Sequence, residues 1–526
     1  MKKHNTAWLV VGVLAASLIL LALLSFFYPK EGITIRGTTY RFASIDDLKS
    51  RWTFLNSDNS ADSIALVMAQ AARRDSLYRA MQDSLNEQFA AKEEVFIKYF
   101  TESASHLYFP VVEYKVPVDS NGVLDTLSVQ TAGWRDTVLY SYFDDFYASL
   151  DNASTEPVRV VHYGDSQIEE DRLSNNLREC LQGRFGGGGV GLLPYRHTYY
   201  NLTVSEQLTG TTTHYSLISY YADAQRKSSN YGPLMQATGI NGDTKMSIFP
   251  RKNTPLTTSH YFNTMKVLTG SEPLKLIVGD TAITTKASEL AITTVNLPDS
   301  TRQIQFRIVG RGDVYGVSLQ NTTGVTVDNV ALRGCSGTIF RQVSKQQLSD
   351  YFAATNTRLI ILEFGGNAIP SISSQKSVDS YIGCLLANAD YLHSIAPTAK
   401  ILFVGPSDMV TSHGGVRTTY KYLPYFDRHA REVFTRAGYA YWSMFDTMGG
   451  SESMIRWVKA TPQLAASDHV HFTRAGAKII GDALADAIIQ GYEYYKLRQS
   501  QLSQPADSIS SDSVMLDSLT IGDETE

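Results

Sequence analysis

The architecture of this protein is encoded most clearly by the stretch Val158-Arg159-Val160-Val161-His162-Tyr163-Gly164-Asp165-Ser166. Its first part is largely apolar and β-branched, which is typical of a buried parallel strand. A glycine closes the strand, and residues 169–185 predict a helix. Ser166 is therefore expected at a strand-to-helix turn, at the carboxyl edge of a parallel sheet. Asp165 is expected to bond backbone groups of this turn rather than to react.

Two further strand-like runs lead to the same edge. Residues 359–364 precede Gly365-Gly366-Asn367, and residues 325–332 precede Arg333-Gly334-Cys335-Ser336-Gly337. Ligands of open α/β sheets usually bind at the carboxyl ends of the strands. We therefore expect these segments and Ser166 to surround one site.

A fourth segment, Asp468-His469-Val470-His471, precedes a long apolar helix predicted over about residues 475–497. A serine hydroxyl is a poor nucleophile until a base takes its proton, and the base works best when a third group fixes its tautomer. Ser166, His471 and Asp468 are the candidates for these three parts. The reaction also needs donors for an oxyanion, and Asn367, the Ser166 N–H and an N–H of a glycine loop can supply them.

In this order, Ser166, Gly337, Asn367 and His471 resemble the four named residues of the SGNH (GDSL) hydrolase family. Gly-Asp-Ser resembles its first block, Cys-Ser-Gly its second, Gly-Gly-Asn its third and Asp-x-x-His its fifth. The resemblance implies a three-layer α/β/α, flavodoxin-like domain around a parallel sheet. It makes Ser166 the nucleophile, His471 the base and Asp468 its orienter, with Gly337 and Asn367 as oxyanion donors.

The chain departs from the family pattern at two places. Gln167 stands where leucine is usual, and Gly334 competes with Gly337 for the role of the second-block glycine. Neither departure removes a catalytic group. The chemistry implied by the resemblance needs no metal and no organic cofactor. Four other histidines lack the spacing of metal ligands: His162, His197, His214 and His260.

Each segment also has a purely structural interpretation. The glycine-containing tripeptides can be tight turns, and Asp468 can be a helix N-cap beside a solvated histidine. Their joint occurrence in family order favours a catalytic site. The run Gly186-Gly187-Gly188-Gly189-Val190-Gly191 resembles a phosphate loop, but it follows a predicted helix and lacks a Lys-Ser or Lys-Thr pair. It is better explained as the end of that helix.

Composition narrows the class of protein. The chain has 526 residues, which exceeds one ordinary domain, and a net charge of −5, which argues against general nucleic-acid binding. Its three cysteines, Cys180, Cys335 and Cys384, form no CxxC pair and predict no disulfide framework.

The first 30 residues predict a membrane anchor. An uncharged apolar stretch from Asn5 to Tyr28 is long enough to cross a bilayer of roughly 30 Å, and Lys2 and Lys3 precede it. A cleaved signal peptide is the alternative, but no convincing cleavage site is present. The positive-inside rule then predicts a single-pass protein of the bacterial inner membrane, with its catalytic part on the periplasmic side.

The remaining chain divides into five predicted segments. Residues 31–102 read as a helical stalk, and residues 103–198 as an extension followed by the start of the catalytic domain. Residues 199–323 lose helical periodicity and alternate apolar with polar residues, which indicates an inserted β-sandwich-like module. Residues 324–498 complete the catalytic domain, and 499–526 form an acidic tail expected to be disordered.

An SGNH core split after its first block by a β-rich insert resembles the bacterial peptidoglycan O-acetylesterases. The resemblance implies an acetylated glycan of the cell envelope as the substrate. The alternatives are an O-acetyltransferase, in which a glycan hydroxyl replaces water, and a glycan-binding protein with a vestigial site. Five tyrosines of the insert region are candidates for sugar stacking: Tyr199, Tyr200, Tyr215, Tyr220 and Tyr221.

Overall fold

The computed structural model describes residues 33–35, 38–40, 106–110, 142–218, 222–252 and 254–502. The expected anchor (1–30), nearly all of the expected stalk and the tail beyond 502 lie outside these residues. The chain forms two units, Met1–Glu93 and Glu94–Glu526, and the described part of the first is a hairpin of β1 (Ile33–Ile35) and β2 (Thr38–Tyr40). Within the described ranges, no helix has the length and apolarity required to span a bilayer.

The second unit contains a six-stranded sheet of five parallel strands and one antiparallel edge strand. Its order is β14 (Gly324–Ala331), β4 (Pro157–Gly164), β15 (Thr357–Glu363), β16 (Lys400–Val404), β19 (Ala440–Trp442) and β3 (Leu107–Tyr108). Only β3 runs antiparallel to its neighbour. In chain order the parallel strands read 2-1-3-4-5, which is the flavodoxin-like arrangement.

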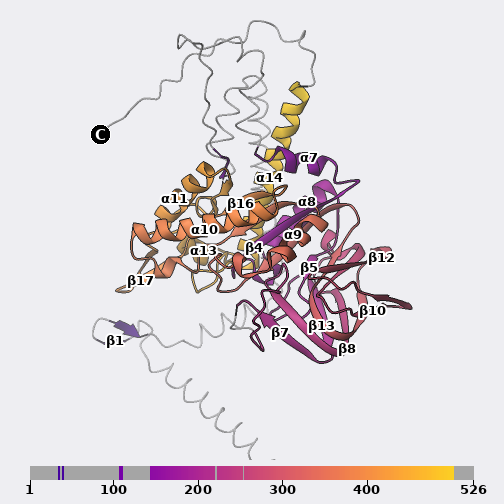
Figure 1. Cartoon of the computed structure of the whole chain (residues 1–526). Coiled ribbons are helices and arrows are strands. Elements are labelled where there is room, and N and C mark those ends of the chain that lie inside the picture. Colours follow the sequence, from indigo (N-terminus) through magenta and orange to yellow (C-terminus); the bar gives the residue numbers. More distant parts are fainter. Residues whose placement is uncertain are drawn as a thin grey trace, which may run out of the picture. The chain divides into compact units, whose positions relative to one another are not determined.

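Helices cover both faces of this sheet, so that three layers result (Figure 1). One layer contains α9 (Lys345–Ala354), α10 (Gln375–Ile395) and α11 (Leu423–Arg436); the other contains α7 (Asp144–Asp151), α8 (Ser174–Phe185) and α14 (Arg474–Leu502). Alternate residues of β4 enter the two cores: Val158 and Val160 on one side, Val161 and Tyr163 on the other. Burial on both faces explains why the strand is almost continuously apolar.

A second, antiparallel sheet lies between β4 and β14 in sequence (Figure 1). Its nine strands are β5 (Gly191–Leu193), β6 (Val204–Thr209), β7 (Thr212–Ser216), β8 (Gln236–Pro250), β9 (Phe262–Thr269), β10 (Lys275–Val278), β11 (Thr281–Thr284), β12 (Ala291–Thr301) and β13 (Ile304–Gln320). We call residues 191–320 the β-module. It has its own apolar core. The expected insert is present, but β5 precedes the boundary expected at residue 199.

The long strand β13 connects the β-module internally. It pairs with β8 and β10 through its first part and with β9 and β5 through its second part. Phe306 and Ile308 are buried, whereas Gln305, which precedes them, and Arg307, which lies between them, are exposed. The predicted alternation of this strand is therefore confirmed.

A buried arginine joins the β-module to the parallel sheet. Arg159 of β4 pairs with Asp328 of β14, and its guanidinium also donates to Ser318 Oγ at 3.2 Å and to Gln320, both in β13. Asp328 Oδ1 accepts the backbone N–H of Leu192 in β5 at 2.8 Å. Since side chains from both sheets satisfy these charges, the β-module is fixed to the edge of the parallel sheet.

The remaining elements are short and lie mainly in the loops. They are η1 (Glu169–Asp171), η3 (Thr258–His260), η4 (Phe340–Gln342), η5 (Ile369–Ser371), α12 (Met444–Thr447), α13 (Ser453–Lys459) and the hairpin of β17 (Val410–His413) and β18 (Val416–Thr419). The helix predicted over 169–185 is thus interrupted. Glu170 and Asp171 have φ angles of 64° and 66°, and α8 begins only at Ser174.

Candidate active site

Ser166 and Asn367 lie on either side of the point where the strand order reverses. Ser166 follows β4, and Asn367 follows the neighbouring strand β15. The chain leaves β4 for β14 on one side, whereas it leaves β15 for β16 on the other. Such a switch point at the carboxyl edge is where open α/β sheets bind ligands. The sheet topology therefore places both residues where the sequence predicted a site.

The hydroxyl of Ser166 contacts the imidazole of His471. The distance from Ser166 Oγ to His471 Nε2 is 2.8 Å. On the other side of the ring, His471 Nδ1 lies 2.7 Å from Asp468 Oδ2. A carboxylate can only accept, so Nδ1 of the neutral ring carries the proton and Nε2 directs its lone pair to the serine. The three residues form a chain that can move a proton away from Ser166.

The loop before α14 also fixes Asp468. Its Oδ1 accepts the backbone N–H groups of Val470 at 2.9 Å and His471 at 3.1 Å. Partial burial raises the pKa of Asp468, but the hydrogen bonds from the His471 side chain and from these two amides outweigh it and lower the pKa below the ordinary value. Asp468 is therefore held as a carboxylate. The bend is completed by His469, whose φ angle is 59°.

Asn367 ties the loops around the site together. Its Nδ2 donates to Asp165 Oδ2 and to the carbonyl oxygen of Cys335, both at 3.0 Å. These acceptors belong to the loops that follow β4 and β14, on the side of the sheet's reversal point where Ser166 lies. In the resting structure, both amide hydrogens are thus directed to protein oxygens. An oxyanion would have to share one of them.

The two candidate glycines lie in different environments. The N–H of Gly337 donates to Cys335 Sγ at 3.3 Å, and a Cβ at Gly337 would lie 2.6 Å from the Phe364 ring. Gly334 is exposed, and a Cβ there would meet no atom within 4 Å. Among the described residues, no acceptor bonds the Gly334 N–H.

Strand pairing brings the segment before Gly334 beside the segment before Ser166. Ala331 is the partner of Gly164 in the parallel pair, and the N–H of Leu332 donates to the Gly164 carbonyl at 2.8 Å. Gly334 is two residues beyond Leu332, just as Ser166 is two residues beyond Gly164. Gly334 thus begins its loop in step with Ser166, and it remains a candidate oxyanion donor beside Gly337.

Ser166, Asn367 and His471 line one cavity of about 240 Å³. Its wall is mostly apolar, with contributions from Phe364, Pro370, Pro406, Met409, Met444 and Val470. This volume lies below the roughly 300–1,000 Å³ of pockets that hold drug-sized ligands. The cavity suits a small, partly apolar group beside the serine hydroxyl. Gly334 and Gly337 are outside its lining.

Gln167 contributes to the site in a way that the sequence did not predict. Its Nε2 donates to the carbonyl oxygen of Val470 at 2.7 Å and to Ser407 Oγ at 2.9 Å. Val470 precedes His471, so Gln167 connects the serine turn directly to the histidine loop. The departure from leucine at this position was the only signal in the sequence. Its two partners lie more than 200 positions away, 240 and 303 residues along the chain.

Two buried carboxyl groups lie under the site. Asp165 Oδ1 accepts the backbone N–H of Gln167 at 3.0 Å, as expected for a turn residue. Burial raises the pKa of Asp165 to about 7; the nearby Glu363 adds to the rise, while hydrogen bonds from Gln167 and Asn367 oppose it. Glu363 Oε2 is 2.9 Å from His162 Nε2. His162 therefore belongs to a buried polar network and does not line the cavity.

The described tyrosines among those proposed for sugar stacking each have a different partner. Tyr199 donates its hydroxyl to the Ala331 carbonyl at 2.7 Å. Tyr215 packs under Arg226, 4.0 Å from its guanidinium carbon, and the exposed Tyr200 lies 3.6 Å from that of Arg251. Tyr220 and Tyr221 lie outside the described residues.

Within the described part, the structure contains no cluster of three His, Cys, Asp or Glu side chains suited to a metal.

The sheet order, the serine after the first parallel strand and the Asp-x-x-His loop before the last helix agree with the arrangement that the SGNH resemblance implied. No family model matches the chain, and no curated protein matches its sequence. Among solved structures, a peptidoglycan O-acetylesterase is similar, with a TM-score of 0.55 and 19% identity over 67% of this chain and 96% of the other.

Two family two carbohydrate esterases, from Cellvibrio japonicus and Clostridium thermocellum, show lower similarity. Their TM-scores are 0.23 and 0.22 and their identities 10% and 11%, covering 58% and 50% of this chain and 98% and 96% of theirs. The first similarity establishes a shared fold with a peptidoglycan O-acetylesterase over most of the described chain.

Proposed function

We propose that this protein is a serine esterase that removes O-acetyl groups from a cell-envelope glycan, with peptidoglycan as the expected polymer. The observation that carries the proposal is the continuous chain from Ser166 Oγ through His471 to Asp468, with contacts of 2.8 Å and 2.7 Å. A vestigial site would have no reason to retain this geometry. The shared fold with a peptidoglycan O-acetylesterase supports the choice of glycan.

In the first half of the reaction, Ser166 Oγ attacks the acetyl carbonyl carbon while His471 Nε2 takes its proton. Asp468 stabilises the imidazolium that results. The tetrahedral intermediate collapses when His471 passes the proton to the sugar oxygen, which leaves as a hydroxyl. The acetyl group remains on Ser166. In the second half, His471 takes a proton from water, which attacks the acetyl carbonyl carbon; the bond to Ser166 Oγ then breaks, His471 returns the proton to Oγ, and acetate is released.

The oxyanion is expected to form beside the backbone N–H groups of Ser166 and Gly334. Neither has a hydrogen-bond acceptor among the described residues, so both are available. Asn367 Nδ2 would add a third, shared hydrogen bond. Donors held in place before the reaction stabilise the transition state without reorganisation, and one such donor is typically worth about 10²–10³ in rate.

The size and lining of the cavity support a short acyl group. A volume of about 240 Å³ bounded by methionine, proline and phenylalanine side chains accommodates an acetyl methyl group and the edge of a sugar, but it is small for a fatty acyl chain. We further propose that residues 1–30 anchor the chain in the inner membrane with the esterase outside the cytoplasm, because O-acetylated envelope glycan is found there.

The proposal is tested by acetate release from O-acetylated peptidoglycan and from a chromogenic acetate ester, with the full chain and its Ser166→Ala variant. We expect the variant to lose nearly all activity while it keeps the circular dichroism spectrum of the wild type. Equal activity of the two proteins would refute the proposal. Faster acetyl transfer to an oligosaccharide than to water would assign the protein to the acetyltransferases instead.

A further inference from the structure

The turn that follows Ser166 has an unfavourable backbone. Glu170 and Asp171 are consecutive non-glycine residues with φ angles of 64° and 66°. A Cβ atom disfavours this left-handed region, and two such residues in succession are rare. The turn is only four residues from Ser166, and the N–H of Glu169 donates to the Ser166 carbonyl at 3.3 Å. Such a conformation persists only where surrounding contacts hold it.

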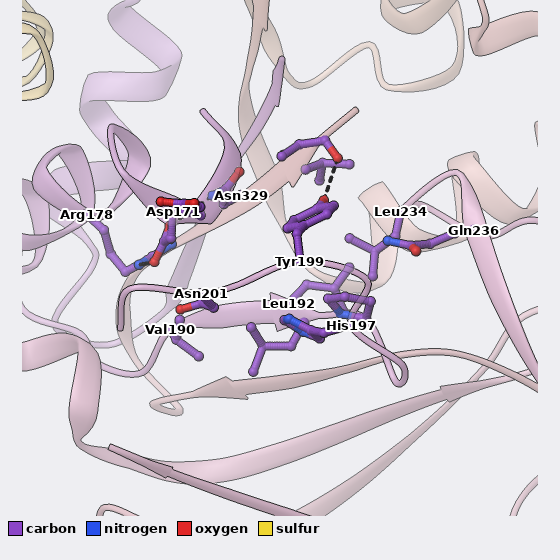
Figure 2. Close-up of a pocket in the computed structure, with 15 residues that line it drawn as sticks. Asp171, Arg178, Val190, Leu192, His197, Tyr199, Asn201, Leu234, Gln236 and Asn329 are labelled. Atoms are coloured by element: carbon purple, nitrogen blue, oxygen red, sulfur yellow. Dashed lines mark hydrogen bonds and ion pairs between the residues drawn. The ribbon is translucent and has the colours of Figure 1, made fainter. Parts of the chain in front are cut away.

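Part of that support comes from the catalytic domain. Arg178 of α8 binds both carboxylate oxygens of Asp171, at 2.7 Å and 2.9 Å, and both side chains are fully buried. Asn329 of β14 donates to Asp171 Oδ1 at 3.2 Å and to the Ile168 carbonyl at 2.9 Å. Figure 2 shows Asp171 beside Arg178 and Asn329 at this junction.

The rest of the support comes from the β-module. The N–H of Leu202 donates to the Glu170 carbonyl at 2.9 Å, and the buried Thr203 donates its hydroxyl to Asp171 Oδ2 at 2.8 Å. Both strained residues of the turn are therefore bonded by two adjacent residues of one module segment. The two contacts run from the loop before β6 of the β-module to the turn after Ser166.

The β-module holds this segment rigidly. Asn201, which lies below the turn in Figure 2, accepts the backbone N–H groups of Thr203 and Val204 with its side chain, at 2.8 Å and 3.1 Å. The Thr203 carbonyl accepts the N–H of Arg251 at 3.2 Å. The backbone of Thr203 is thus held by residues of its own module, while its side chain bonds Asp171.

The same turn also connects to the oxyanion loop. Glu169 pairs with Arg333, and its Oε2 lies 2.9 Å from Arg333 Nε. Arg333 immediately precedes Gly334. A displacement of residues 169–171 would therefore move both Ser166 and the expected oxyanion donor. In the reaction, a shift of about 1 Å in such groups can cost about 10²-fold in rate.

We infer that Thr203 is a positioning residue of the esterase, through which the β-module holds the strained turn at Glu170 and Asp171 and so aligns Ser166. The inference rests on the proposed function, because it takes Ser166 as the nucleophile. In this inference the β-module contributes to catalysis without binding the glycan. Its effect on kcat should therefore be seen also with substrates too small to contact the module.

The test compares two changes at one position in the full chain. Thr203→Val keeps the shape of the side chain but removes the hydroxyl, and Thr203→Ser keeps the hydroxyl. With a chromogenic acetate ester we expect Thr203→Val to lower kcat about tenfold with little change in KM, and Thr203→Ser to retain kcat within about twofold. Labelling of Ser166 by a fluorophosphonate should slow in parallel with kcat.

A buried threonine elsewhere in the β-module provides the matched control. The hydroxyl of Thr244 contacts Tyr195 and donates to the Ile308 carbonyl at 2.9 Å, entirely within the module. Thr244→Val should lower the unfolding temperature but leave kcat per folded molecule unchanged. Wild-type kcat in Thr203→Val, or an equal fall in Thr244→Val, would overturn the inference.

A second variant covers the case in which Thr203→Val does not fold. Glu170→Gly removes the unfavourable Cβ from the strained turn, so folding is preserved. Combined with Thr203→Val, it relieves part of the strain that the lost hydroxyl no longer holds, and we expect the double variant to fold and to recover kcat relative to Thr203→Val or, where that variant does not fold, to retain most of the wild-type kcat. A double variant that folds with kcat still about tenfold or more below that of Glu170→Gly alone would overturn the inference. A failure of the proposed function is distinct, since Ser166→Ala would then keep its activity.

Discussion

The Nε2 atom of His471 lies 2.8 Å from the Oγ atom of Ser166, although 305 positions separate the two residues in the sequence. The contact is made because β4 is an internal strand of the sheet and the loop before α14 returns to the edge where β4 ends. Asp468, three residues before His471, holds the imidazole in the orientation that this contact requires. Because the two residues are only three positions apart, one loop carries both the imidazole and the carboxylate that orients it.

Replacing Asp468 by asparagine should leave the fold intact and impair catalysis. The amide cannot stabilise the imidazolium, and it can hold the wrong tautomer of His471, so we expect kcat to fall on the order of 10²–10⁴-fold with a small change in KM. Steady-state kinetics on a chromogenic acetate ester measure this. Asp482→Asn is the matched control, because Asp482 pairs with Lys478 on α14 at 2.6 Å. A kcat loss of equal size in the control would contradict the assignment of Asp468.

Gln167→Leu should disconnect the serine turn from the histidine loop. The change removes the hydrogen bonds to Val470 and Ser407, each worth about 0.5–1.5 kcal/mol, and we expect kcat to fall about tenfold. The comparison is with Gln182→Leu, since the buried Gln182 also donates two side-chain hydrogen bonds, in its case to the backbone carbonyls of Gly189 and Val325. Both variants should lose stability in chemical denaturation. Only the first should lose kcat, and equal kcat values would count against a positioning role for Gln167.

The stability of the protein should depend on pH through Asp165. Burial raises the pKa of this carboxyl from 3.8 to about 7, so the folded state binds its proton more tightly than the unfolded state. The stabilisation is complete below about pH 4 and is lost as the pH rises toward 7, by about 1.4 kcal/mol per pH unit. Asp165→Asn cannot titrate. The free energy of unfolding of the wild type should therefore fall relative to that of the variant between pH 4 and 7 and then run parallel to it.

Chemical denaturation of both proteins across this range measures the difference. A difference that stays constant with pH, or that grows in favour of the wild type as the pH rises, would contradict the raised pKa of Asp165. A matched series with Asp482→Asn controls for effects of general surface charge.

The two glycines of the second block should respond differently to alanine. Gly337→Ala places a methyl group 2.6 Å from the Phe364 ring at a φ of 79°, and overpacking of this kind costs about 1–3 kcal/mol. Gly334→Ala meets open space, so its stability cost is limited to the strain of a φ of 77°. We nevertheless expect Gly334→Ala to lower kcat, because strain there shifts an oxyanion donor. Chemical denaturation and steady-state kinetics of both variants test which glycine supplies the oxyanion donor. A kcat loss confined to Gly337→Ala would assign that role to Gly337.

Three strands of the parallel sheet, β4, β14 and β15, and part of β13 in the β-module could be predicted because their residues alternate or continue in ways that burial requires. The valines of β4 and the alternation of Phe306 and Ile308 in β13 are local signals, and the structure confirms both. The positions of Ser166 and Asn367 followed from the ends of their strands. Their meeting at one edge followed from the general rule that parallel strands present their carboxyl ends there, whereas Asp468 and His471 were identified from their spacing before the last helix and from the family resemblance.

Other features could not be predicted because they depend on partners distant in sequence. Arg159 interrupts an apolar strand, and its charge is satisfied by Asp328 and by β13 residues about 160 positions away. The left-handed turn at Glu170 and Asp171 depends on Thr203 and Arg178, so residues 169–185 alone predicted one unbroken helix. The position of Gly334 in step with Ser166 required the register of β14 against β4.

Both parallel neighbours of β4 follow the β-module in the chain, β14 beginning at Gly324 and β15 at Thr357. During synthesis β4 therefore has neither parallel neighbour until the whole β-module has been made. The strands of the module pair with one another and do not need β14 or β15. An unpaired strand of valines is prone to associate with other chains. The order of the segments thus makes early completion of the β-module a safeguard for the nascent protein, and any mutation that delays its folding should first appear as aggregation rather than as a slower enzyme.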